Sequence, residues 1–501
     1  MKDYIKNINI RLLKNEKWHY FHTTCLVSKL KYYSLIVLIS FIFLLLFSTA
    51  TSPLYKNYWL FGDGGIFMLV GKSFLNGKML YSGIFETKGP VLFFIQVVGQ
   101  LIMKGKYGIF IIQILNMSIV LLFLRKIALL FCSPKQTWGV IMLSLMFLGS
   151  VLDEGNRNEE FSLVFLVIPL YLVLQDFMVK RFILKHTFIY GICFALVSFI
   201  KLSNAAMLGA LVFTIGTFLI IDGKWKLLFK HIGLFLLGIL IVSGIISTYF
   251  LANNAFKEMI DGTFLWNFLY TSTGNFKIGF SVIYSVLISL FAIIVAYRYY
   301  KLYKNRILLV FIIAFAIFDL IAVNLVRSSG LYQILNMPLV TLIISIFFYI
   351  YSRFECKKCK ISLMIEFFTL YFLPMLFLLT VSCKHLVYLR TESPENLYNK
   401  IPKYKIPDSE KSNVIGYNAP ATWYLHEDIT PCYKYAFLQE HWAGKITQEV
   451  KDDFNSFMLN EKPLWLLTTT EIHNPTLTNI ISRYYIEKDK TDDYILYRLK
   501  K

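Results

Sequence analysis

The chain has 501 residues, of which 56% are hydrophobic and 16% charged, and its mean hydropathy is +0.57. Its many apolar runs of about fifteen residues or more exclude an ordinary soluble protein and predict a polytopic membrane protein. The net charge of +20 does not indicate a nucleic-acid partner. Residues 384–501 hold 16 basic and 16 acidic side chains, so the excess lies in short clusters between the apolar runs.

Eleven apolar runs predict about eleven transmembrane helices. They lie at 33–50, 108–124, 137–152, 161–178, 187–201, 205–221, 232–252, 278–296, 307–325, 334–352 and 362–382. The segment before the first run carries seven Lys and Arg side chains. If it lies in the cytoplasm, every loop on that side is basic, as the positive-inside rule requires. We therefore expect a multi-pass protein of the cell membrane with a cytoplasmic N-terminus.

The segment 51–107 is predicted to lie outside the membrane and to contain juxtamembrane helices. Its apolar stretch Val91–Met103 has 13 residues, too few to cross a bilayer, and counting it as a crossing would invert every later basic loop. Pro90 suits the first turn of a helix, because that position needs no amide donor. We expect an interfacial helix here, within a membrane domain that covers residues 1–383.

Residues 384–501 change character and are predicted to form a small extracytoplasmic α/β domain. The stretches SNVIGYN, PLWLLTT and DDYILYRL alternate like strands, and ATWYLHE between the first two suits a short helix. The odd number of spans places this domain outside.

Two polar clusters of the predicted outer face have no role in building a membrane helix. The first is WLFGDGGIFML (59–69), in which Asp63 stands between glycines. Asp and Gly form turns, but these glycines would also let the backbone approach a ligand closely. Lys88 follows in the same segment, just before the helix start at Gly89-Pro90, where free amides and the helix dipole favour an anion. The second cluster is DEGNRNEE (153–160), with four carboxylates and one arginine. Each cluster can also be read as a solvated loop.

These segments resemble a known family. Asp63 after the first span, GKSFLNGKMLY at 71–81 and FETKGP at 85–90 resemble the first outer loop of GT-C-fold glycosyltransferases, including bacterial members related to protein mannosyltransferases and the aminoarabinose transferase. GNRNEEFSL at 155–163 is similar to a second motif of the group, and Lys201 also fits. Near LYQILNMP (331–338) many relatives carry a His-Tyr pair, whereas Leu331 and Tyr332 stand there in this chain, so no histidine role is transferred.

The resemblance implies a GT-C-like fold and an inverting transfer of a sugar from a polyprenyl-phosphate-linked donor. Asp63 is the expected base, and we expect partial desolvation to raise its pKa. The other candidate catalytic acids are Glu86, Glu159 and Glu160. The candidate phosphate-binding cations are Lys88, Arg327, Lys201 and Arg157. For Arg327 and Lys201 the alternative is a side chain that snorkels from a helix end. A divalent cation, Mg²⁺ or Mn²⁺, would suit Glu159 and Glu160, but no spacing demands one.

The expected partners are membrane lipid, a polyprenyl-phosphate sugar lipid as donor, and a cell-envelope glycan, lipid or protein as acceptor. One alternative is a flippase or exporter of lipid-linked polysaccharide intermediates, which would need polar residues inside its spans; Asp319 and Glu366 are the chief ones. Another is a polysaccharide polymerase, which would be expected to use arginine-rich outer loops. Such loops are not evident in the sequence.

Overall fold

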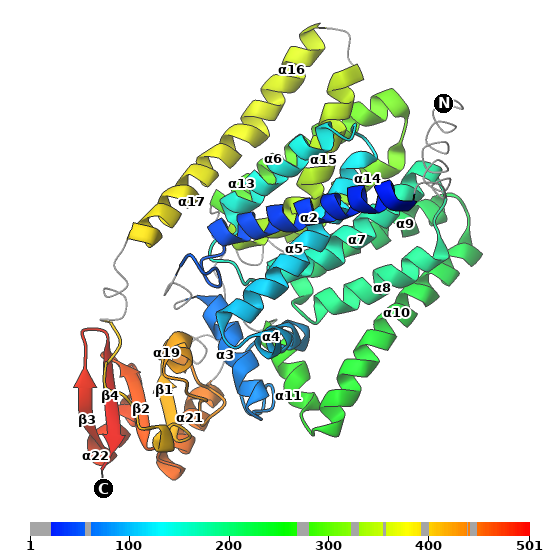
Figure 1. Cartoon of the computed structure of the whole chain (residues 1–501). Helices are drawn as coiled ribbons and strands as arrows, with labels where there is room; N and C mark the ends of the chain where they lie inside the picture. The colour runs from blue at the N-terminus through cyan, green and yellow to red at the C-terminus, as the bar shows by residue number, and fades with distance from the viewer. Residues whose placement is uncertain are drawn as a thin grey trace.

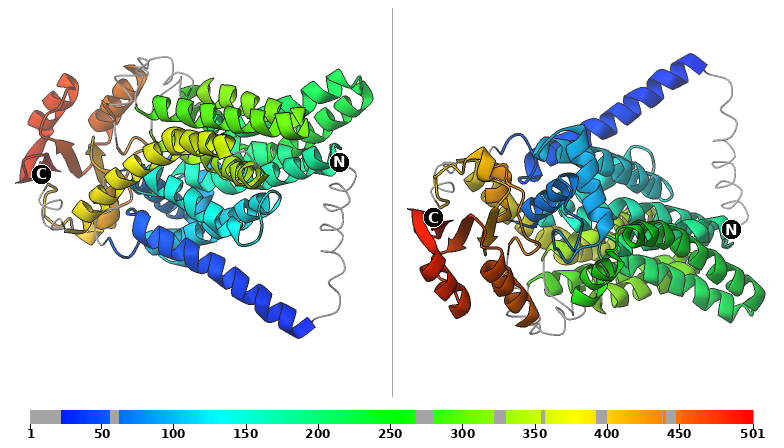
Figure 2. Two further views of the ribbon diagram at one scale, coloured as in Figure 1. Left: turned by 90° about the horizontal axis from the view of Figure 1, so that it is seen from above. Right: turned by 90° about the horizontal axis from the view of Figure 1, so that it is seen from below.

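The computed structural model describes residues 22–55, 62–267, 280–321, 330–353, 357–391, 400–437, 439–440 and 448–500. A long helical bundle occupies most of the chain, and a small sheet with its own helices lies against one end of it (Figures 1 and 2). This arrangement confirms the predicted fold class, an α-helical membrane protein with a C-terminal α/β part.

In their described residues, all eleven predicted spans coincide with helices. The helices of the bundle are α2 (His22–Phe47), α5 (Lys106–Leu129), α6 (Gln136–Val151), α7 (Asn158–Val179), α8 (Leu184–Ser198), α9 (Ala206–Ile221), α10 (Trp225–Ala252), α13 (Phe280–Tyr303), α14 (Arg306–Asp319), α15 (Met337–Arg353), α16 (Lys357–Phe367) and α17 (Leu373–Thr391). Short helical segments join several of them: η1 (Leu202–Ala205), α11 (Phe256–Ile260), η2 (Asp261–Leu265), η4 (Gly330–Asn336) and η5 (Phe368–Phe372). Among the described residues, eight helical segments are long and apolar enough to cross a membrane. The other three predicted spans fall on the shorter helices α6, α8 and α14.

The helices differ in how much of their apolar surface the protein itself covers. In the span that contains α15 (Tyr332–Arg353), 89% of the most apolar stretch is buried inside the protein. In the spans of α2 and α10 the buried share is 22%. Large side chains such as Leu240 and Ile245 on α10 are exposed. A helix that is apolar all round but covered on one side only is suited to contact lipid with the other. We therefore place α15 inside the bundle and α2 and α10 at its lipid-facing edge.

Two short helices of the segment 51–107 cap one end of the bundle. They are α3 (Asp63–Leu75) and α4 (Pro90–Ile102), which pack against each other, and α4 also packs on α5. Pro90 occupies the start of α4, as predicted. The expected short helix is therefore present, and its position beside the bundle end suits an interfacial location (Figure 1).

The C-terminal part contains a four-stranded sheet in the order β1-β2-β4-β3. Its elements are η6 (Asp408–Glu410), β1 (Val414–Tyr417), α19 (Ala421–His426), α21 (Gln448–Asn460), β2 (Trp465–Thr469), α22 (Pro475–Tyr484), β3 (Tyr485–Lys490) and β4 (Tyr494–Leu499). β1 and β2 are parallel, and β4 is antiparallel to both β2 and β3. The three predicted strands and the helix at 421–427 are confirmed. β3 was not predicted, because its exposed sequence YIEKDK has no clear apolar alternation.

This C-terminal sheet unit is docked on α3 and on the loop 76–89. The backbone amide of Phe85 donates to the carbonyl of Lys434 at 2.9 Å, and Lys72 of α3 pairs with Asp428 at 2.5 Å. Buried apolar side chains of both parts form one continuous cluster. The docked unit therefore lies next to the end of the bundle where the predicted site residues are found.

Candidate active site

The predicted site residues in the described part of the chain are contributed by segments at one end of the bundle, beside α3 and α4 (Figure 1). They are Asp63, Glu86, Lys88, Arg157, Glu159, Glu160 and Lys201. Several of them act electrostatically on Lys88. Burial disfavours its charge, but Glu86, Asp63, Tyr332 and Glu159 together raise its pKa above the ordinary value. Arg327, the remaining predicted residue, lies outside the described residues.

Asp63 forms an ion pair with Arg157, whose Nη1 lies 2.7 Å from Asp63 Oδ2. Asp63 is the first residue of α3, where the helix dipole favours a negative charge. Desolvation by the surrounding protein would raise the pKa of Asp63, but Arg157, with Lys88 and Lys201, outweighs it and lowers the pKa below the ordinary value. The expected rise of this pKa was therefore wrong. The Asp63 side chain is still 47% exposed, so an ionised carboxylate faces solvent.

Arg157 is shared among three acids. Its Nη2 lies 2.6 Å from Asp153 Oδ2 and 3.1 Å from Glu154 Oε1, and its side chain is only 7% exposed. Burial disfavours the charged guanidinium, but Glu154, Asp63 and Asp153 raise its pKa, so it stays charged. These contacts are those of a group that fixes Asp63 in place. The phosphate-binding role expected of Arg157 stays a prediction.

Glu154 binds the backbone at the start of α3. Its Oε1 accepts a hydrogen bond from the Gly64 amide at 3.0 Å, and its carbonyl accepts one from the Ala50 amide at 2.8 Å. A Cβ on Gly62 would lie 1.9 Å from Glu154 Oε2. The space at Gly62, expected to admit a ligand, is thus filled by Glu154. Asn156 adds a further bond to the Gly64 carbonyl at 3.0 Å.

Lys201, between α8 and η1, is held by an acid and a ring. Its Nζ lies 3.1 Å from Glu159 Oε1 and 4.0 Å from the centre of the Tyr332 ring. Glu159 is almost fully buried, and Lys201 is 14% exposed. Tyr332 belongs to η4 and was not predicted as a site residue. The signal for it was its place in the segment where relatives carry a His-Tyr pair.

Lys88 has a similar arrangement with Glu86, whose Oε1 lies 3.3 Å from Lys88 Nζ. The two side chains are 17% and 6% exposed. The Thr87 hydroxyl also accepts from Lys88 Nζ at 3.3 Å, and the Tyr81 hydroxyl donates to the Lys88 carbonyl at 2.8 Å. Each lysine of the site thus carries one buried glutamate as its counterion.

The loop that carries Lys88 is fastened to the end of α8. The Gly89 amide donates to the Ile200 carbonyl at 2.9 Å, and the Val91 amide donates to the Phe199 carbonyl at 3.1 Å. These amides at the start of α4 were expected to be free for an anion; that expectation was wrong, because the chain itself uses them. The same bonds bring Lys88 toward Lys201, since Lys201 directly follows the two acceptor residues. The amides of Gly89 and Val91 are therefore not available to a phosphate.

Glu160 faces α5 rather than Asp63. Gln113 Nε2 donates to its two carboxylate oxygens at 3.1 and 2.9 Å, and the backbone amides of Asn156 and Arg157 also donate to it. The side chain is completely buried. These contacts anchor the first turn of α7 to α5, and a catalytic role for Glu160 stays a prediction.

A divalent cation has no ready site in the part of the chain that the structure describes, where no three His, Cys, Asp or Glu side chains are arranged to hold a metal ion. Three acids of this site, Asp63, Asp153 and Glu154, all bind the Arg157 guanidinium. The acids considered as ligands are occupied as well, Glu159 by Lys201 and Glu160 by Gln113.

Comparison with known proteins identifies the fold. No protein-family model matches the chain, and no curated protein matches it. Among solved structures, it is similar to ArnT from Cupriavidus metallidurans in the apo state, with 12% identity and a TM-score of 0.58, over 94% of this chain and 98% of that one. A structure of the same ArnT bound to undecaprenyl phosphate gives 11% identity and a TM-score of 0.56 over the same shares. ArnT is an aminoarabinose transferase of the GT-C fold. The predicted GT-C-like fold is therefore confirmed.

Proposed function

We propose that this protein is an integral-membrane glycosyltransferase. It moves a sugar from a polyprenyl-phosphate-linked donor to a glycan, lipid or protein of the cell envelope, on the outer face and with inversion. The observation that carries the proposal is the half-exposed, ionised Asp63 in one electrostatic cluster with Lys88 and Lys201. The fold supports it, because an ArnT of this fold binds undecaprenyl phosphate.

In the proposed reaction Asp63 is the base. The acceptor oxygen or nitrogen attacks the anomeric carbon, and its proton passes to the Asp63 carboxylate as the new bond forms. The bond from the anomeric carbon to the phosphate oxygen breaks, and its electron pair leaves on the phosphate. A single displacement of this kind inverts the anomeric centre. Positioned proton transfer contributes about 10²–10⁴-fold to such rates.

The low pKa of Asp63 fits this role in one respect and limits it in another. Arg157 keeps the carboxylate in its basic form at neutral pH and fixes its direction. A carboxylate of low pKa is a weak base, so it accepts the proton late, when the attacking atom has already gained positive charge. Stabilisation of the charge on the departing phosphate must then supply more of the rate enhancement.

Lys88 and Lys201 are proposed to stabilise that phosphate. A lysine ammonium has three donors. Lys201 directs one at Glu159, and Lys88 directs two at Glu86 and Thr87, which leaves each lysine a donor for a phosphate oxygen. Glu86 and Glu159 then act as positioning residues, because they hold the two ammonium groups in place and keep them charged. Arg327 is proposed as a further phosphate contact from the sequence alone.

The transporter alternative gains no support from the acids inside the spans. Asp319 is 2% exposed and accepts hydrogen bonds from Ser285 at 3.1 Å and Asn336 at 3.4 Å. Glu366 pairs with Arg298. Both acids are thus used to join neighbouring helices. A conduction pathway would instead need polar groups that line an aqueous route.

The proposal is tested by comparing cell-envelope glycans and lipids by mass spectrometry with and without the gene. We expect one sugar to disappear from an envelope component and to return with the wild-type gene but not with Asp63→Asn. The missing sugar would identify donor and acceptor together. Unmodified glycans, with a lipid-linked intermediate accumulating on the inner leaflet, would instead establish a transporter and refute the enzyme.

A further inference from the structure

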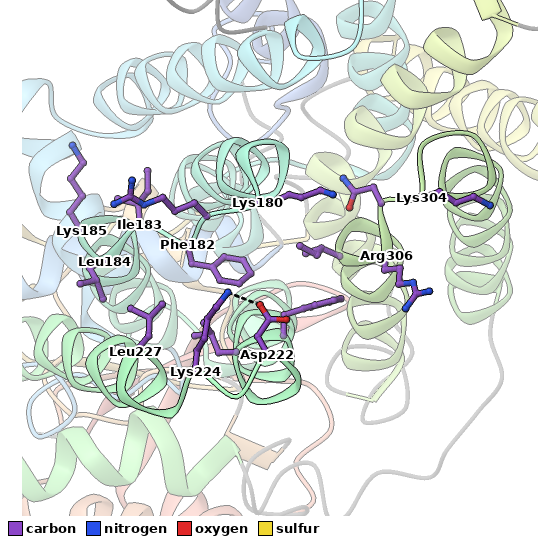
Figure 3. Close-up of a pocket in the computed structure, with 15 residues that line it drawn as sticks. Lys180, Phe182, Ile183, Leu184, Lys185, Asp222, Lys224, Leu227, Lys304 and Arg306 are labelled. Carbon is purple, nitrogen blue, oxygen red and sulfur yellow. Dashed lines mark hydrogen bonds and ion pairs between the residues drawn. The ribbon is translucent and has the colours of Figure 1, made fainter. Parts of the chain in front are cut away.

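A second polar feature lies at the end of the bundle opposite Asp63. Here the junctions α7–α8, α9–α10 and α13–α14 enclose a cavity of about 690 Å³ (Figure 3). Its lining includes one carboxylate, Asp222, and six cations: Lys180, Arg181, Lys185, Lys224, Lys304 and Arg306. Asp222 is paired with Lys224 at 2.7 Å. The cavity is therefore strongly positive and suits an anion.

The junctions that supply these cations have a fixed geometry. Asp176, which is buried at the end of α7, accepts the Ile183 amide at 3.2 Å and lies 3.0 Å from His186 Nδ1, while its carbonyl accepts the Arg181 amide at 3.1 Å. Lys180 has a left-handed backbone, with φ of 52°, just after α7. These contacts fix the backbone of the 180–183 turn, so Lys180 and Arg181 extend from defined backbone positions at the cavity.

The cavity combines this charge with an apolar floor. Phe182, Leu219, Leu227 and Ile307 line it and are buried or half-buried, whereas the six cations are exposed at its rim. Figure 3 shows Lys180 reaching across the opening toward the side on which Arg306 lies, with Lys185 and Lys304 at the outer edges. A site with cations above and hydrocarbon below matches an amphiphile better than a free anion.

We propose that this cavity binds the phosphate-bearing head group of an anionic phospholipid, with the first part of its acyl chains on the apolar floor. α7 has 22 residues and spans about 33 Å, so the cavity lies about one hydrocarbon thickness from the Asp63 end, at the opposite head-group level. The basic loops predict that this level is cytoplasmic. Basic pockets between transmembrane helices on that side suit anionic head groups. The proposal does not depend on the sugar-transfer function.

The test is native mass spectrometry of the full-length protein with phosphatidylglycerol, and with phosphatidylcholine as the neutral lipid. The pocket variant is Lys180→Gln/Lys224→Gln/Arg306→Gln. The matched control is Lys226→Gln/Lys230→Gln/Lys301→Gln, which removes three exposed cations of the same face that do not line the cavity. We expect phosphatidylglycerol to bind the wild type selectively, and the pocket variant to bind it about tenfold more weakly or worse, with the control unchanged. If the triple variant does not fold, Lys180→Gln and Arg306→Gln are tested singly.

Two results would overturn the proposal. Equal losses in the pocket and control variants would mean that the charge of the whole face attracts the lipid. Tight binding of inorganic phosphate to the wild type in neutral lipid, with phosphatidylglycerol no stronger, would mean that the cavity takes a free anion.

Discussion

The Arg157 guanidinium lies 2.7 Å from the Asp63 carboxylate, although Asp63 is the first residue of α3 and Arg157 directly precedes α7. The same guanidinium also binds Asp153 and Glu154. This sharing gives the site a fixed, ionised acid at the exposed start of α3. In the proposed reaction, Arg157 therefore helps to keep the Asp63 carboxylate ionised.

The pH dependence of sugar transfer should report this pair. In the wild type the pKa of Asp63 is lowered, so lowering the pH from 7 to about 5 should not protonate it or slow the reaction on its account. In Arg157→Gln the largest opposing influence is gone and desolvation raises this pKa, so activity should fall at higher pH than in the wild type. The measurement is a pH–rate profile.

The control for that profile is Arg157→Lys, which keeps a positive charge. Its rate should begin to fall at a lower pH than that of Arg157→Gln. An acid limb at the same pH in all three proteins would show that Arg157 does not control the ionisation of the base.

Lys88→Gln and Lys201→Gln should weaken binding of a polyprenyl phosphate, each by about tenfold, because each removes one charge-assisted hydrogen bond. The measurement is binding of undecaprenyl phosphate to the purified protein. Lys104→Gln removes an exposed lysine between α4 and α5 and is the control. Affinities equal to the wild type in both site variants would assign the phosphate to other groups.

Gly89→Ala should lower both stability and activity. A Cβ there would lie 2.0 Å from the Phe199 carbonyl oxygen, so the backbone must move and Lys88 with it. Gly139→Ala in α6 meets nothing within 4 Å and replaces a poor helix former, so it should be neutral or slightly stabilising. Thermal unfolding and transfer rate are measured for both. A Gly89→Ala protein that behaves like Gly139→Ala would contradict the docking of this loop on the end of α8.

Phe85→Ala should loosen the C-terminal sheet unit. Phe85 is 5% exposed and packs on Trp266, at 4.6 Å between ring centres, and on Tyr435 at 5.3 Å. Truncating a buried phenylalanine costs about 3–5 kcal/mol. Limited proteolysis should then cleave residues 400–500 faster. Phe229→Ala, at a side chain 67% exposed on α10, should leave the cleavage rate unchanged; equal rates in the two variants would mean that Phe85 does not hold this unit.

The architecture was largely predictable because a bilayer imposes long apolar runs and biased loop charges. In the described part of the chain, each of the eleven runs falls on a helix, and Pro90 begins α4. The gathering of Asp63, Lys88 and Lys201 at one end of the bundle was also predictable, since all three lie on the same predicted side of the membrane. β3 was missed because YIEKDK lies exposed, and its pairing with β4 overrides its weak local pattern.

The pairing within the site was not predictable, because it depends on which groups meet across helices. Nothing local distinguishes Glu154, which fills the space at Gly62, from the neighbouring acids of the same loop. The lowered pKa of Asp63 requires Arg157 at 2.7 Å, and a sequence shows only that an arginine is available. Likewise, the amides at Gly89 and Val91 look free until the end of α8 is placed against them.

The most direct test of Asp63 as the base is the single-turnover rate of sugar transfer, measured at saturating donor for Asp63→Asn and Asp153→Asn. The two acids are a matched pair, since both bind Arg157 and their side chains are 47% and 50% exposed. We expect Asp63→Asn to lower the rate by about 10²–10⁴-fold and Asp153→Asn by less than about tenfold. Equal, small losses in the two variants would contradict the proposed role of Asp63.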